Sequence, residues 1–291
     1  MKFSDKLILG TVQLGIPYGI NNNTGKPDQS TANAILHSAW EGGIRLLDTA
    51  ESYGNAQQVI GHYHVGQAES FHVITKLMPG KTPAEVRPSL LEDMNLLNVD
   101  SLYGFMFHHL NVFKQNVSAL GDLKSMQAKG RIKRIGVSVY SNDELEYVLN
   151  FPEINLIQLP FNMLDNWCQR GGHISKAKEK GIEIHVRSVF LQGLFFMKET
   201  EIPVKLSPLV PFLRQLKKIC NEFNMSMELA AMGYALARPE IDKVLIGVET
   251  PAQLQDNLNQ VAQLQISKEF TSAVEEIYVS ETELLSPVNW K

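Results

Sequence analysis

The chain has 291 residues, of which 44% are hydrophobic, a size and composition typical of one large or two small globular domains. Its formal net charge at pH 7 is −4, with acidic and basic residues interspersed, which argues against nucleic acid as a partner. No apolar run approaches the roughly 18 residues of a membrane span. The two cysteines fit no metal-ligand spacing, and the N-terminus lacks the apolar run of a signal peptide, so we expect a cytoplasmic protein.

Short apolar runs rich in Val, Ile and Leu recur along the chain. They are nearly continuous rather than alternating, which is typical of strands buried on both faces of a parallel sheet. The sequence therefore predicts eight strands, at residues 7–13, 44–50, 71–77, 101–109, 132–139, 155–162, 182–190 and 243–249.

Segments with helical periodicity separate these runs. The first, 30–41, begins with capping-type residues and is ended by Gly42 and Gly43. Eight strands that alternate with helices predict an α/β protein with a single (β/α)8 barrel domain over residues 1–291. A doubly wound sheet is the alternative, but no G-x-G-x-x-G motif follows any strand. The other predicted helices are 84–97, 116–130, 143–149, 173–180, 211–224 and 227–237.

Two long irregular segments, 15–28 and 195–211, follow the first and seventh predicted strands. Loops at this end of a barrel build active sites, so we expect these two segments and the C-terminal tail to shape a substrate pocket. Tyr18 and Trp290 are substrate-contact candidates within them, and the polar run 21–23 suits a sugar or another polyol.

Most of the predicted strands have a polar residue at their carboxyl end. Asp48, Lys76 and His108 end the second to fourth strands, and Tyr53 follows Asp48 by five residues. A lysine ammonium near a phenol lowers the phenol pKa from about 10. We expect Asp48 to pair with Lys76 and Tyr53 to act as a general acid for a carbonyl oxygen, with hydride supplied by a nicotinamide. The remaining polar strand ends are Gln13, Ser138, Gln158 and Arg187.

These motifs resemble those of the aldo-keto reductases. The segment 48–54 reads D-T-A-x-x-Y-G, a lysine closes the third strand, and a histidine closes the fourth. GRIKRIGVS at 130–138, IQLPFN at 157–162 and IGVETPAQLQDNL at 246–258 are similar to further segments of the family, in the same order.

The resemblance implies roles for individual residues. Tyr53 would be the general acid, completed by Asp48, Lys76 and His108. Ser138 and Gln158 match positions that bind the nicotinamide carboxamide, Ser188 and Leu191 fall in a loop that contacts the pyrophosphate, and Gln253 and Asn257 match adenosine-binding positions. The candidates for substrate contact are Gln13, Tyr18, His109 and Trp290, and no metal ligand is expected.

Three departures from the family pattern concern the cofactor. Val139 follows Ser138 where the family has Asn, and Arg187 replaces an aromatic residue that stacks on the nicotinamide. Arg187 is expected to stack there or to face the substrate. Gly247 and Gln253 occupy positions where many members carry a cation for the 2′-phosphate of NADP, and Glu249 adds a negative charge nearby. The resemblance favours NADP(H) slightly, with NAD(H) as the alternative.

The predicted function is therefore NAD(P)H-dependent reduction of an aldehyde or ketone, a sugar or sugar derivative included, to the alcohol. A cofactor-binding regulatory protein of the same fold with little turnover is the alternative. An unrelated barrel lyase or isomerase is a third interpretation, and no sequence feature bears on oligomeric state.

Overall fold

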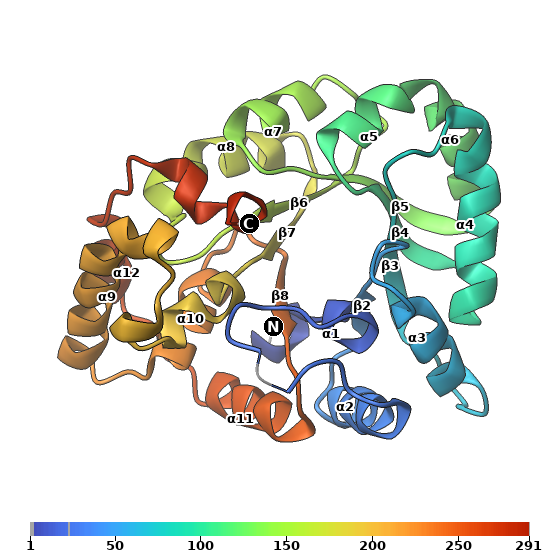
Figure 1. Ribbon diagram of the computed structural model, residues 1–291. Helices are drawn as coiled ribbons and strands as arrows, with labels where there is room; N and C mark the ends of the chain where they lie inside the picture. Colours follow the sequence, from blue (N-terminus) through green and yellow to red (C-terminus); the bar gives the residue numbers. More distant parts are fainter. Residues whose placement is uncertain (1–2, 23, 291) are drawn as a thin grey trace.

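A computed structural model describes residues 3–22 and 24–290. Eight parallel strands close into a barrel in chain order (Figure 1). This confirms the predicted (β/α)8 barrel, although the strands are shorter than the apolar runs. The strands are β1 Leu7–Gly10, β2 Leu46–Asp48, β3 His72–Leu77, β4 Leu102–Phe107, β5 Ile132–Ser138, β6 Leu156–Pro160, β7 Glu183–Arg187 and β8 Lys243–Gly247.

Helices surround the barrel and connect its strands (Figure 1). Side-chain caps begin several of them: Asp28 accepts the Thr31 N–H of α2, and Thr82 and Glu85 form a capping box on α4. No helix in the described ranges is long and apolar enough to cross a membrane. The helices are α1 Val12–Gly15, α2 Gln29–Glu41, α3 Ala56–His64, α4 Pro83–Leu97, α5 Leu110–Gln115, α6 Leu120–Ala128, α7 Asn142–Val148, α8 Trp167–Glu179, α9 Val210–Glu222, α10 Met227–Leu236, α11 Pro251–Ala262 and α12 Lys268–Glu275.

Several predicted boundaries are wrong. Gln13 is not a strand end, because the chain turns into α1 directly after β1. The segment predicted as one helix over 116–130 begins with a 3-10 turn at Val117–Ala119 and continues as α6, while the separate helix α5 precedes it. Helix α8 begins at Trp167 rather than 173, since the pair Gly171-Gly172, which suggests a break, lies inside it. A Cβ at Gly171 would lie 2.5 Å from the Trp167 ring, so packing explains that glycine. The segment 195–211 contains 3-10 turns.

The barrel interior is filled by apolar side chains below a polar layer. Ile8, Leu46, Ile74, Met106 and Leu156 form one buried cluster inside the strands. Alternate residues of a strand point to the same face, so the residue two positions further along each strand lies above this cluster. Those positions hold Asp48 on β2, Lys76 on β3, His108 after β4 and Gln158 on β6.

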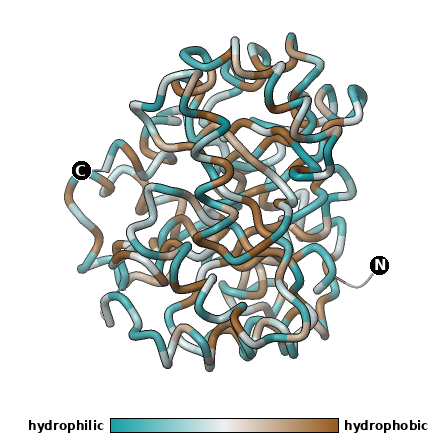
Figure 2. The backbone as a smooth tube through the Cα atoms, turned by 90° about the vertical axis from the view of Figure 1, so that its right-hand side faces the viewer, coloured by the Kyte–Doolittle hydropathy of each residue, from teal (hydrophilic) through white to brown (hydrophobic). Residues whose placement is uncertain are grey.

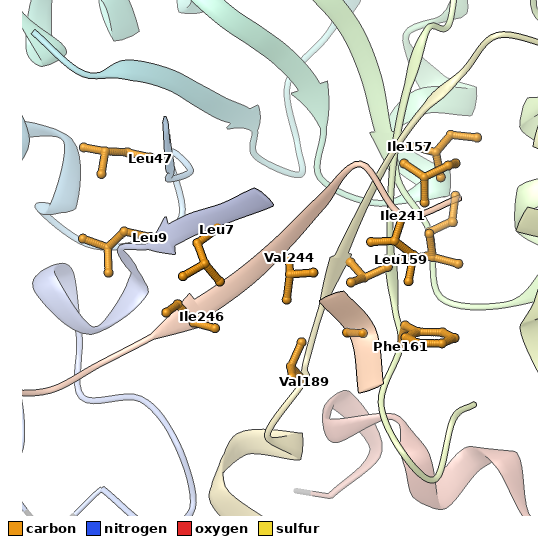
Figure 3. Close-up of a cluster of buried hydrophobic side chains, with 14 of the residues drawn as sticks. Leu7, Leu9, Leu47, Ile157, Leu159, Phe161, Val189, Ile241, Val244 and Ile246 are labelled. Atoms are coloured by element: carbon orange, nitrogen blue, oxygen red, sulfur yellow. The ribbon is translucent and has the colours of Figure 1, made fainter. Parts of the chain in front are cut away.

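A second, larger apolar cluster lies between the strands and the surrounding helices. Figure 3 shows part of it, where Leu7 and Leu9 of β1 lie near Val244 and Ile246 of β8. Apolar stretches gather toward the middle of the molecule in Figure 2, and polar and apolar residues alternate along its periphery. The two clusters hold the strands in fixed register, which fixes the positions of the polar residues at their carboxyl ends.

Candidate active site

A buried polar triad occupies the carboxyl end of the barrel. Lys76 Nζ donates to Asp48 Oδ1 and, at 3.1 Å, to the carbonyl oxygen of Thr49. Gln158 Nε2 donates to Asp48 Oδ2 at 2.7 Å. Asp48, Lys76 and Gln158 are each 1% exposed, so the ion pair is shielded from water and its carboxylate is bound on both oxygens. Asp48 and Lys76 form the expected pair, and the Gln158 amide is bound to that pair.

Tyr53 lies beside the triad on the turn between β2 and α3. Its ring centre is 5.2 Å from Lys76 Nζ, and its ring meets that of His108 edge-on at 5.6 Å. Gly15, at the end of α1, packs against this turn: a Cβ there would lie 1.7 Å from the Tyr53 carbonyl oxygen. The contact between α1 and the turn therefore sets the position of Tyr53.

The environment of Tyr53 differs electrostatically from the prediction. The sequence predicts that Lys76 lowers the pKa of the phenol. In the structure the pKa of Tyr53 is raised well above its ordinary value of 10.0, first by burial and then by the Asp48 carboxylate. The Lys76 ammonium is itself paired with Asp48, and burial lowers the pKa of Lys76. These effects keep the Tyr53 phenol protonated.

His108 is neutral in the structure. Burial, reinforced by the charge of Lys76, lowers the pKa of His108 to about 2. Its Nδ1 lies 3.0 Å from Ser52 Oγ. A serine hydroxyl that donates to Nδ1 fixes the tautomer with the proton on Nε2, and this N–H can then donate to a bound oxygen. Sequence analysis missed Ser52, although it directly precedes Tyr53.

A series of stacked planar side chains begins at His108 and extends across the carboxyl end of the barrel. His108 stacks on His109 at 4.7 Å, and His109 stacks on Tyr140 at 5.5 Å. The Arg187 guanidinium lies 4.3 Å from the centre of the Tyr140 ring. Its hydrogen bonds to Ser188 Oγ and Val139 O are long, at 3.4 Å each, so Tyr140 is the main support that positions this cation.

A cavity of about 420 Å³ opens beside Tyr53. It runs from Tyr53 and Arg187 to the loop after β8 and to α11. Its volume lies in the range of small-molecule and cofactor sites. It brings together these residues that the sequence singled out: Gln13, Tyr18, Tyr53, Arg187, Ser188, Gly247, Glu249, Gln253 and Asn257.

The segment after β1 bridges two edges of this cavity. The Tyr18 hydroxyl accepts a hydrogen bond from Gln192 Nε2 at 2.9 Å, on the loop after β7. Thr24 Oγ1 donates to Glu249 Oε2 at 3.3 Å, on the loop after β8. The predicted loop 15–28 therefore contributes to the cavity wall, whereas the cavity takes only Phe196 from the predicted loop 195–211.

Other sequence candidates lie outside the lining. Ser138 is paired in register with Gln158, and both are buried. The Leu191 side chain is fully buried in the core. Trp290 donates its indole N–H to the Leu284 carbonyl oxygen at 2.8 Å, within the tail.

The chain matches known proteins over nearly its whole length. The sequence profile described as "Aldo/keto reductase family" matches residues 6–279. The chain belongs to the aldo/keto reductase family. It is therefore an oxidoreductase of a family that uses nicotinamide cofactors and acts on small carbonyl compounds.

Curated relatives and a solved structure agree with this membership. The chain is 23% identical over 263 residues to the NADH-specific methylglyoxal reductase of Escherichia coli K12, covering 74% of this chain and 78% of that protein. It is 22% identical to the D-threo-aldose 1-dehydrogenase of a Pseudomonas species, covering 79% and 82%. A holo-form structure of an aldo-keto reductase from Bacillus halodurans shares the fold, with a TM-score of 0.75, 18% identity and coverage of 95% and 94%.

The cavity of this aldo-keto reductase fits a nucleotide. Gln13 Oε1 is buried without a hydrogen-bond partner in the structure, so an acceptor is available to a ligand. A Cβ at Gly247 would lie 2.5 Å from Gln13 Nε2, so the Gln13 amide packs directly over Gly247 where β8 meets the cavity. The described part of the chain contains no cluster of three potential metal ligands.

Sequence analysis also missed cavity-lining residues of this aldo-keto reductase. Asp256 stands directly before Asn257 within the motif quoted for the resemblance, so its position was a usable signal. Glu228 and Gln260 come from α10 and α11, and no local pattern connects them with the strand ends. Asn21 and Asn22 belong to the polar run that the sequence indicated, whereas these other lining residues of the loops were not singled out: Gly19, Val189, Phe190, Gln192, Gly193, Phe196 and Val248.

Proposed function

We propose that this aldo-keto reductase reduces a small aldehyde or ketone, sugars and sugar derivatives included, to the alcohol, with Tyr53 as the proton donor. The observation that carries the proposal is the position of Tyr53, which lines the cavity while its ring adjoins Lys76 and His108. A bound nicotinamide nucleotide supplies hydride to the carbonyl carbon.

The chain's own residues handle the proton. The Tyr53 O–H donates its proton to the carbonyl oxygen as the hydride reaches carbon, so a C–H and an O–H bond form together. The raised pKa keeps the phenol protonated before reaction, so the proton is present when the carbonyl oxygen gains negative charge. Neutral His108 donates an N–H to the same oxygen, and Asp48 with Gln158 holds the Lys76 ammonium in place.

Substrate and cofactor contacts follow from the cavity lining. We propose that Arg187, Ser188, Gly247, Glu249, Gln253 and Asn257 contact the nucleotide, with Ser138, Gln158 and Leu191 supporting that surface from below. Gln13, Tyr18 and His109 border the substrate space, together with Asn21 and Asn22; Asn23 lies outside the described residues. Trp290 lies outside the cavity lining, and its proposed contact with substrate rests on the resemblance alone. The names of the relatives support aldehyde and sugar substrates.

The cellular context is proposed on composition alone. We place the protein in the cytoplasm with a small carbonyl compound as its partner. Its cofactor is NAD(H) or NADP(H). The family preference favours NADP(H) slightly, while the name of the Escherichia coli relative favours NAD(H).

Replacement of Tyr53 by Phe tests the mechanism. Tyr53→Phe removes the O–H and keeps the ring, so kcat for methylglyoxal or glyceraldehyde should fall by about 10²–10⁴-fold. Nucleotide affinity, measured by quenching of protein fluorescence, should stay within a factor of about two, since the ring packing is unchanged.

Two outcomes would contradict the proposal. Turnover that survives Tyr53→Phe excludes Tyr53 as the acid. Wild-type protein that binds nucleotide but reduces nothing in a panel of aldehydes, ketones and sugars is instead the cofactor-binding regulatory protein.

A further inference from the structure

The cavity has a strongly asymmetric charge. Arg187 is the only cationic side chain among the described residues that line it, and it lies at the Tyr53 end. The opposite end is formed by α10, α11 and the loop after β8, and it carries three carboxylates. These are Glu228, Glu249 and Asp256.

Glu249 is positioned by hydrogen bonds from two elements. Its Oε2 accepts from Thr24 Oγ1 at 3.3 Å, which leaves the other carboxylate oxygen available. Its backbone N–H donates to Gln253 Oε1 at 2.7 Å, and the Gln253 Nε2 donors are thereby turned away from that contact. A carboxylate acceptor and an amide donor thus adjoin each other at the wall of the cavity.

This pair matches a ribose diol better than a phosphate. A ribose 2′-hydroxyl can donate to the Glu249 carboxylate and accept from the Gln253 amide. A 2′-phosphate carries about −1.5 to −2 charges and accepts but does not donate, so it would meet like charge from Glu249, Glu228 and Asp256.

Provided that the cavity binds a nicotinamide nucleotide as proposed above, we propose that Glu249 and Gln253 make this protein selective for NAD(H) over NADP(H). This reverses the slight preference that the family resemblance suggests. Both nucleotides carry the same pyrophosphate, so the ratio of their affinities reports on the 2′-phosphate alone.

Direct binding measurements test the selectivity without turnover. Dissociation constants for NADH and NADPH are measured by fluorescence titration of the wild type, Glu249→Gln and Glu249→Lys. Glu179→Lys, at an exposed position on α8 outside the cavity lining, is the matched control for charge. Wild-type protein should bind NADH about tenfold or more tightly than NADPH.

The variants should shift this ratio in order of charge. Glu249→Gln should reduce the preference for NADH over NADPH severalfold. Glu249→Lys should shift the ratio of the two dissociation constants in favour of NADPH by about tenfold or more, while Glu179→Lys should leave the ratio unchanged. A wild type that binds NADPH as tightly as NADH overturns the inference, as does a ratio that Glu249→Gln does not change. Failure to bind either nucleotide overturns the proposed function instead. If Glu249→Lys melts at a lower temperature than wild type, the wild-type ratio and Glu249→Gln decide.

Discussion

Tyr53 shows how a single residue depends on its neighbours' charges. The ammonium closest to its ring is bound to a carboxylate, and that carboxylate raises the pKa of the phenol further. Tyr53 therefore stays protonated. His108 stays neutral, because the pKa of His108 is lowered to about 2. Arg187 acts against burial and the Asp48 charge, because its positive charge lowers the pKa of Tyr53.

Arg187 should tune the balance between oxidised and reduced nucleotide. A cation at the Tyr53 end of the cavity disfavours the positively charged oxidised nicotinamide. Arg187→Tyr should therefore strengthen binding of NAD⁺ relative to NADH, by about tenfold if the charges interact through roughly 1.4 kcal/mol. Fluorescence and calorimetric titration with each form measures the ratio.

The charge-conserving variant separates charge from shape. Arg187→Lys should keep the wild-type ratio, because it retains the cation. If Arg187→Tyr alters neither nucleotide affinity nor the KM for any carbonyl substrate, Arg187 does not face the site.

At the scale of elements, the site depends on a close contact between α1 and the turn after β2. Gly15 lies under the Tyr53 carbonyl oxygen, and Gly54 adopts a φ of 57° in the same turn. Thr11 ties the end of β1 to the same region, because its side chain donates to the Asp48 carbonyl oxygen at 2.9 Å. Helix α1, which the sequence analysis assigned to the end of the first strand, thus supports Tyr53, the proposed general acid.

Gly15→Ala should therefore damage activity as well as stability. The added methyl group would force the Tyr53 turn away from the barrel, so we expect a loss of about 1–3 kcal/mol in the free energy of unfolding. The kcat should fall more than the nucleotide affinity, since the proton donor moves. Urea denaturation and steady-state kinetics measure the two effects.

Gly172→Ala is the matched control for a glycine within a helix. A Cβ at Gly172 meets no described atom within 4 Å, so alanine should stabilise α8 by about 0.5–1 kcal/mol and leave kcat unchanged. Equal kinetics for the Gly15 and Gly172 variants would contradict the supporting role of α1.

At the scale of the whole molecule, stability should depend on a buried carboxyl group outside the cavity lining. Asp93 on α4 is 2% exposed and accepts a hydrogen bond from Gln57 Nε2 at 2.8 Å, and the same nitrogen donates to Thr75 Oγ1 at 2.8 Å. Burial, aided by the charge of Glu51, raises the pKa of Asp93 from 3.8 to about 8. The neutral Asp93 carboxyl thus belongs to a hydrogen-bonded group that connects α4 with α3 and β3 through Gln57 and Thr75.

Asp93→Asn should flatten the pH dependence of stability. The folded state binds the Asp93 proton more tightly than the unfolded chain, so the stabilisation is full below about pH 4 and is lost as the pH rises toward 8. At one pKa unit per about 1.4 kcal/mol, the loss is on the order of a few kcal/mol. Asn stays neutral and removes this contribution. Denaturant unfolding of both proteins from pH 5 to pH 9 measures the difference.

Asp122→Asn makes the same change of side chain at an exposed position on α6, and Asp122 is not among the charges that shift the pKa of Asp93. It should keep the wild-type pH profile. Wild-type and Asp93→Asn profiles that stay parallel would show that Asp93 ionises normally.

The periodicity of the sequence was sufficient to predict the barrel and to place four polar residues at one of its ends. Asp48, Lys76, His108 and Gln158 each stand two residues after a buried apolar residue, and parallel strands bring such positions to one end of the barrel. Tyr53 was indicated by the D-T-A-x-x-Y-G segment at residues 48–54 and by the family resemblance that this segment supports. Gln13 was assigned to a strand, since an apolar run does not reveal where its backbone turns into a helix.

The tertiary structure decided the charges and the contacts across elements. Ser52 beside His108, Tyr140 under Arg187 and the raised pKa of Tyr53 depend on distances through space that no local pattern contains. The acidic end of the cavity unites Glu228, Glu249 and Asp256 from three segments of the chain. The sequence determined which chemistry the strand ends carry, because side-chain alternation is a local property of the backbone. Only the folded chain decided how burial and neighbouring charges shift the pKa of each group and which groups line the cavity, because burial and electrostatic fields sum over residues distant in sequence.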